Sequence, residues 1–125
     1  MTHNYTSRPE QYLQEYLAWM RMLEFYKEEN IFFKTRLSEV VDHEADKDFL
    51  ALAEQFQNQF IIKDDFIDEL RHDINAMEVT VKENKTTPGI KLEIKHNKLR
   101  NGMEYLEKSF TQLKKEFNGY LLSIV

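Results

Sequence analysis

The chain has 125 residues, which is the size of one domain, and a formal net charge of -5. The absence of cysteine excludes disulfides and thiolate chemistry, and the acidic balance excludes a general attraction to nucleic acid or to anionic membranes. Hydrophobic residues make up 42% of the chain and charged residues 31%, a balance that favours amphipathic helices and excludes wholesale disorder.

The first predicted element is a helix over residues 9–41, after a flexible tail over residues 1–7. Ser7 and Glu10 resemble a capping box at its start. Apolar residues then recur at alternating steps of four and three, the seven-residue repeat of helices that pack along one seam. Asn30 is the only strongly polar member of this seam. The seam consists of Tyr12, Tyr16, Trp19, Leu23, Tyr26, Asn30, Phe33, Leu37 and Val40.

The second predicted element is a helix over residues 47–84. Asp46 is its predicted N-cap, and the short polar linker before it permits only an antiparallel hairpin with the first helix. Lys63 is the only charged residue in its seam. The seam consists of Phe49, Ala53, Phe56, Phe60, Lys63, Ile67, Leu70, Ile74, Met77 and Val81.

The third predicted element is a helix over residues 88–124, with Thr87 as its cap and the following proline in its first turn. The short turn before it places Leu70 beside Leu106. His96 is the one titratable residue of its seam. The seam consists of Leu92, His96, Leu99, Met103, Leu106, Phe110, Leu113, Phe117, Tyr120 and Ile124.

These three repeats predict an all-α fold, an elongated antiparallel three-helix bundle with coiled-coil-like packing. Each helix has more than thirty residues, or roughly 50 Å at the usual rise, so the molecule should be a rod. We expect residues 1–125 to form a single helical-bundle domain.

Two Glu-x-x-His motifs are the most specific sign of metal chemistry in the sequence. Glu69 with His72, and Glu93 with His96, have the spacing found in di-iron helical bundles. The expected pairing of the helices separates the motifs by roughly 20 Å, and two such motifs must share one level to hold two metals. We therefore expect no metal site, a solvated His72, and a structural His96 that could make one end of the rod sensitive to pH.

The polar seam residues Asn30 and Lys63 are predicted to lie close together in the core. Pairing Leu37 with Ala53 places Asn30 beside Phe60 and within a turn of Lys63. Polar residues in a heptad seam commonly fix the alignment of helices, so our preferred interpretation is a register pin. The alternative is a small-ligand pocket in which Lys63 meets an acidic group.

Some large apolar residues lie outside the predicted seams. They stand to one side of the first helix and on a comparable flank of the second, and a contiguous apolar patch of this kind favours a partner surface. The alternative is that they widen the core of the bundle. The predicted interaction surface consists of Met22, Phe25, Phe32, Ile62 and Phe66.

The first two predicted helices resemble small bacterial helical proteins of uncharacterised function. The likeness rests on residues 24–29 (EFYKEE), 34–41 (KTRLSEVV) and 54–61 (EQFQNQFI). It implies a bacterial, cytosolic, coiled-coil-like protein, and it supplies no activity and no functional residue.

The sequence therefore predicts a non-enzymatic interaction or scaffold module that associates with itself as a homodimer. No serine or threonine has a recognisable base partner, and three glycines form no phosphate-binding loop, so we expect no catalytic residue and no cofactor. The chain lacks a long apolar run and an apolar secretion signal, which indicates a cytoplasmic protein without membrane contact. The alternative function is a small-ligand-binding or metal-binding bundle.

Overall fold

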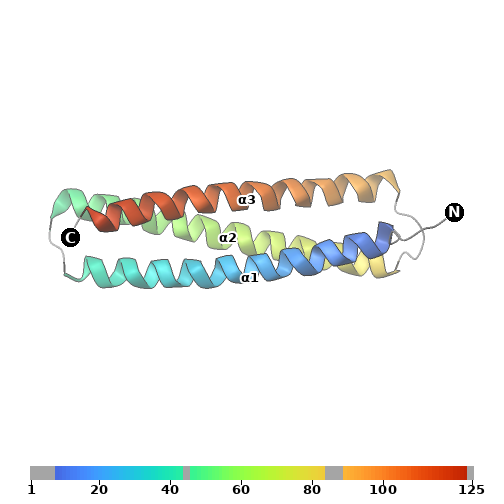
Figure 1. Cartoon of the computed structure of the whole chain (residues 1–125), viewed down its shortest axis with the longest axis horizontal. Helices are drawn as coiled ribbons and strands as arrows, with labels where there is room; N and C mark the ends of the chain where they lie inside the picture. Colours follow the sequence, from blue (N-terminus) through green and yellow to red (C-terminus); the bar gives the residue numbers. More distant parts are fainter. Residues whose placement is uncertain (1–7, 44–45, 84–88, 124–125) are drawn as a thin grey trace.

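Three long helices lie side by side and form a rod (Figure 1). The computed structural model describes residues 8–43, 46–83 and 89–123. Helix α1 spans Arg8–Val41, α2 spans Lys47–Glu83 and α3 spans Ile90–Leu122. Helices α1 and α3 run in one direction and α2 runs in the other, which confirms the predicted antiparallel three-helix bundle. No helix in the described part of the chain combines the length and apolarity needed to span a membrane.

The predicted seams form the core of the bundle. Every described seam residue is buried or half-buried, and Asn30, Lys63 and His96 are the buried polar residues among them. Ile124 lies outside the described residues. The seven-residue repeat therefore accounts for the interior, because it keeps one side of each helix turned toward the other two.

The first and last residues of the three helices lie within two residues of the predicted bounds. The Asp46 carboxylate accepts a hydrogen bond from the backbone N–H of Phe49 at 2.9 Å, which caps α2 as predicted. Helix α3 begins at Ile90 and has Gly89 at the cap position, where no side chain makes a capping hydrogen bond. The predicted caps at Ser7 and Thr87, and the predicted tail 1–7, lie outside the described residues.

The alignment of the helices along the rod agrees with the sequence for one pair and differs for the other. Asn30 of α1 donates a hydrogen bond to the backbone oxygen of Phe60 at 2.8 Å, as the predicted hairpin requires. On the other side, Leu70 packs against Gly102, where an added Cβ would lie only 2.9 Å from a Leu70 methyl carbon. The expected pairing of Leu70 with Leu106 is therefore wrong by about one turn. A glycine at 102 lets α3 approach Leu70 closely.

Aromatic rings fill the half of the core nearest the α1–α2 connection. The Phe117 ring lies 5.0 Å from Phe60 on α2 and 5.6 Å from Phe33 on α1, measured between ring centroids. The Phe49 and Tyr120 rings are stacked at 4.7 Å, and the Tyr120 hydroxyl donates to the Phe49 backbone oxygen at 2.9 Å. Contacts of this kind hold α3 against the hairpin of α1 and α2.

Candidate functional site

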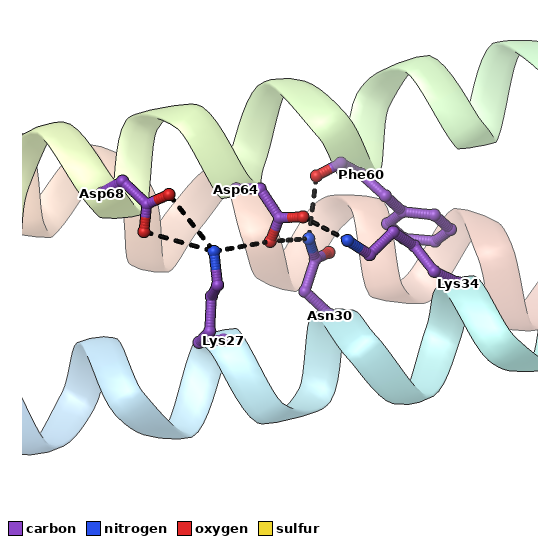
Figure 2. Close-up of polar contacts among 6 residues, drawn as sticks. All are labelled: Lys27, Asn30, Lys34, Phe60, Asp64 and Asp68. Atoms are coloured by element: carbon purple, nitrogen blue, oxygen red, sulfur yellow. Dashed lines mark hydrogen bonds and ion pairs between the residues drawn. The ribbon is translucent and has the colours of Figure 1, made fainter.

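A group of charged and amide side chains joins α1 to α2. The Asp64 carboxylate accepts a hydrogen bond from the Asn30 amide at 2.7 Å and is paired with the Lys34 ammonium. The Lys27 ammonium lies 3.6 Å from Asp64 and 3.2 Å from Asp68. Figure 2 shows the Asp64 carboxylate between the two lysines, so a single side chain of α2 ties together two successive turns of α1. The Asp64 cluster consists of Lys27, Asn30, Lys34, Asp64 and Asp68.

The surrounding groups keep Asp64 charged. Burial is the largest single effect and by itself raises the pKa of this carboxyl group, because the ionised form loses water. Hydrogen bonds from Lys34 and Asn30 and the charges of Lys34 and Lys27 together outweigh burial, so the pKa of Asp64 lies below its ordinary value of 3.8. Asp64 is therefore ionised at neutral pH and available to both lysines.

Asn30 and Lys63, the two residues of the predicted pin, do not meet. Asn30 is fully buried and bonded to α2, whereas the Lys63 ammonium lies 5.9 Å from the centre of the Tyr105 ring on α3. Asn30 lies beside Phe60 as predicted, but the two polar groups do not cluster, because the long stem of Lys63 carries its charge toward α3. The role of Asn30 as a register pin stays a prediction, now with Asp64 as its partner.

A second buried polar group surrounds His96, at the end of the rod where α1 begins. The His96 ring is fully buried and stacks on Tyr12, with 3.6 Å between the ring centroids. Its Nδ1 lies 2.8 Å from the Tyr16 hydroxyl, and its Nε2 lies 3.2 Å from a Glu15 carboxylate oxygen. Arg100 binds the same carboxylate at 2.8 Å. The His96 cluster consists of Tyr12, Glu15, Tyr16, His96 and Arg100.

Two neutral tautomers of His96 fit its partners. Nε2 lies 3.2 Å from the Glu15 carboxylate, which can only accept, and 3.3 Å from the Arg100 guanidinium, which can only donate. With the proton on Nε2, the ring donates to Glu15 and Nδ1 accepts from the Tyr16 hydroxyl; with the proton on Nδ1, the ring donates to Tyr16 and Nε2 accepts from Arg100. Burial lowers the pKa of His96 below its ordinary value of 6.5; the hydrogen bond and the charge of Glu15 oppose this, while Arg100 adds to it. His96 is therefore neutral at pH 7, and a neutral ring can hydrogen-bond through both of its nitrogens.

We expect the stability of the bundle to fall as the pH is lowered below about 6.5. The pKa of His96 is lower in the folded chain than in the unfolded chain, so below pH 6.5 the unfolded chain binds the extra proton. Its contribution is complete above pH 6.5 and decreases until the pH reaches the folded pKa. Urea unfolding between pH 5 and pH 8 measures this, and His96→Phe, which retains a flat ring on Tyr12, should lose most of the slope. An equal slope in both proteins would show that other groups cause it.

On α1, the predicted interaction residues lie on the flank of the helix that is next to α3. Glu29 binds Lys114 of α3 at 2.8 Å, which identifies this side of α1. Phe25 lies four residues before Glu29 and Phe32 three residues after it, so both side chains flank Glu29 on the helix surface. Met22, seven residues before Glu29, is half-buried on the same side.

On α2, the two remaining predicted interaction residues also face α3, from the opposite side of that helix. The Phe66 ring meets the Tyr105 ring edge-on at 5.7 Å, and Ile62 lies one turn earlier. The junction of α1 and α2 is occupied instead by the Asp64 cluster. Helix α3 therefore separates the two groups, and the expectation of a single surface shared by α1 and α2 is wrong.

The two Glu-x-x-His motifs do not combine. Because α2 and α3 are antiparallel and Leu70 lies against Gly102, Glu69 is level with residue 103 of α3, about 15 Å along the axis from Glu93. His72 is exposed, and both ring nitrogens of His96 are already hydrogen-bonded. Within residues 8–43, 46–83 and 89–123, no three His, Asp or Glu side chains are grouped so that they could hold a metal ion.

The charged partners Asp64, Lys34, Glu15 and Arg100 were missed by the sequence argument, which followed only the seams. The sequence did contain a sign of these ion pairs, because each of the four residues is next to a seam residue in the chain. The two residues of each pair also carry opposite charges and lie at the same level along the rod. Charges beside a seam commonly form bridges between helices, so they are informative once the alignment of the helices is known.

The fold and these clusters define a class of protein: a long three-helix bundle whose helices are joined by buried polar groups and whose surface retains exposed apolar rings. Comparison with known proteins finds no family model, no curated protein and no solved structure that matches the chain. Its function must therefore be inferred from its own surface and interior.

Proposed function

We propose that this chain is a non-enzymatic interaction module of the bacterial cytoplasm that forms a homodimer through α1. The observation that carries the proposal is the exposure of two phenyl rings on one side of that helix. Phe25 is 55% exposed and Phe32 is 65% exposed. Together with the half-buried Met22 they form the α1 strip, which consists of Met22, Phe25 and Phe32.

The α1 strip is more apolar than a rod of this kind needs for its own folding. All described residues of the three seams are already buried or half-buried, so the exposed Phe25 and Phe32 rings are not needed to fill the interior. Burying one phenyl ring in an interface contributes about 1.5–3 kcal/mol, and two per chain offer a substantial part of the free energy of association. Exposed apolar patches on small proteins commonly mark such contacts.

A second copy of the chain is the partner that fits the spacing of the strip. Phe25 and Phe32 are seven residues apart, which places them on one line of the helix, about 10 Å from each other. If two copies of α1 cross antiparallel about a twofold axis, Phe25 of each copy meets Phe32 of the other. This self-complementary arrangement is the usual one in homodimers.

The side-chain contacts support a role in binding over a role in catalysis. The hydroxyls of Thr80, Ser109 and Ser123 donate to backbone oxygens three or four residues earlier in the chain, so they are engaged in structure. His96 is enclosed by aromatic rings and held by Glu15. These contacts favour a structural use of the residue types from which nucleophiles and bases are drawn.

Light scattering after size exclusion tests the dimer. We expect the natural chain to have twice the monomer mass of 15.1 kDa, and Phe25→Glu combined with Phe32→Glu to have the monomer mass. The charged side chains oppose burial of the strip while leaving the core intact.

The matched control is Ile94→Glu, which places a charge at a 62% exposed apolar residue of α3, outside the strip. This variant should remain dimeric. A natural chain that stays monomeric at high concentration would contradict the proposal, and so would dissociation caused equally by Ile94→Glu.

A further inference from the structure

A hollow of about 720 Å³ lies in the groove between α2 and α3. Volumes of about 300–1,000 Å³ are typical of sites for small molecules. One part of its wall is apolar, and amide and hydroxyl groups line its rim. The apolar wall includes Leu52, Phe56 and Leu113, and the polar rim includes Gln59, Ser109 and Gln112.

Lys63 borders this hollow and is only 6% exposed. Its ammonium makes no hydrogen bond or ion pair with any residue that the structure describes, and the Tyr105 ring at 5.9 Å is the one group recorded near its charge. Lys27, Lys34 and Lys114 are all paired with carboxylates although their side chains are 29%, 34% and 43% exposed. The most buried of these four lysines is thus the one without an anion.

We propose that this hollow binds a small organic acid, with the carboxylate on Lys63 and the apolar body of the ligand against Leu52, Phe56 and Leu113. The stem of Lys63 is almost fully buried and its ammonium reaches the hollow without a counterion, so an anion bound there would offset the loss of water around the charge. The hollow lies on the opposite side of α3 from the α1 strip. The proposal therefore does not depend on the proposed dimer.

The charges around the hollow favour a carboxylate over a phosphate. Lys63 is its single cation, and Glu116 on the rim adds negative charge. Phosphate carries up to two charges and is usually held by several cations or by free backbone N–H groups at a helix start. The residues that line the hollow lie beyond the first turn of both α2 and α3, where backbone N–H groups are used within the helices. One ammonium matches one carboxylate.

Binding should depend on the charge of Lys63. Burial lowers the pKa of Lys63 below its ordinary value, because the charged form loses water. A bound carboxylate favours the charged form, so the affinity should fall as the pH is raised through the range in which the free site loses its proton.

Calorimetric titration with octanoate, octanol, acetate and inorganic phosphate tests the proposal. Octanoate should bind one to one. Octanol lacks the charge, acetate lacks the apolar body and phosphate has the wrong charge and shape, so each should bind at least tenfold more weakly. Octanoate should also shift the nuclear magnetic resonance signal of the Lys63 ε-methylene group.

Lys63→Met replaces the ammonium with an apolar chain of similar length, and it should weaken octanoate at least tenfold while raising the melting temperature. Lys108→Met, on the exposed side of α3, is the matched control and should change neither quantity. Leu52→Trp provides a second variant at a 45% exposed wall residue, which should narrow the hollow and weaken octanoate while the bundle stays folded.

Equal binding of octanoate to the natural chain and to Lys63→Met would overturn the proposal. So would octanol binding as tightly as octanoate, or phosphate binding with the same dependence on Lys63. Failure of octanoate to bind, with Lys63 shifted instead when the chain meets an acidic protein partner, would also overturn it and assign Lys63 to a protein contact.

Discussion

Asp64→Ala is expected to destabilise the bundle by about 2 kcal/mol. The change removes the acceptor of the Asn30 amide and the counterion of Lys34, and it leaves Lys34 and Lys27 as neighbouring positive charges. Asp64 has a side chain only 15% exposed, so solvent compensates little for the loss. Urea unfolding followed by far-ultraviolet circular dichroism measures the effect.

The matched control is Asp65→Ala, because Asp65 is the next residue on α2 and is exposed. This control should change the free energy of unfolding by less than about 0.5 kcal/mol. Equal effects of the two substitutions would show that the Asp64 cluster does not join the helices in solution.

Asn30→Leu gives a contrast within the same cluster. It leaves Asp64 with both lysines and removes the Asn30 carbonyl oxygen, a buried acceptor without a hydrogen-bond donor. A buried polar residue in a seam is retained for alignment more than for stability. We therefore expect Asp64 to contribute most of the stability that the cluster provides, and Asn30 to restrict which turns of α1 and α2 can face one another.

The seams could be predicted from the sequence because a residue is buried when it lies on the side of its helix that faces the other two helices. A heptad repeat identifies the residues on that side. Tyr16, Ile67 and Leu106 are each fully buried, as their positions in the repeat require. The alignment of α1 with α2 followed from a short linker. The alignment of α2 with α3 was wrong by a turn, since the approach of Leu70 to Gly102 depends on local shape that a repeat does not encode.

The surface could not be predicted in the same way, because two arrangements of three helices bury the same seams. The third helix can lie on either side of the hairpin. If α3 lay on one side of the hairpin, the flanks of α1 and α2 that carry Phe25 and Phe66 would be neighbours. If it lay on the other side, α3 would separate these flanks. The contacts of Glu29 with Lys114 and of Phe66 with Tyr105 show the second arrangement. The direction of Lys63 was missed for a related reason, since its ammonium lies far from its Cα.

Phe117→Ala is expected to cost about 4 kcal/mol, the largest effect of any substitution considered. The Phe117 ring is fully buried and lies within 5.6 Å of the rings of Phe33, Phe56 and Phe60, so it joins all three helices. Its removal leaves a cavity that rigid neighbouring rings close poorly. Chemical unfolding gives the free energy, with exposed Asn118→Ala as the control.

The residues that lose protection from hydrogen exchange in Phe117→Ala should show whether only α3 is loosened or the whole bundle is destabilised. Helices α1 and α2 remain tied by Asp64 and Asn30 when Phe117 is removed, whereas α3 loses its central contact near that end. Hydrogen exchange should therefore increase most in the last turns of α3 and less around Asp64. A loss below about 2 kcal/mol, or protection lost equally along all three helices, would mean that the rings do not form one closed interior. The wall of the α2–α3 hollow would then be too mobile to hold a ligand, because Phe56 packs directly on Phe117.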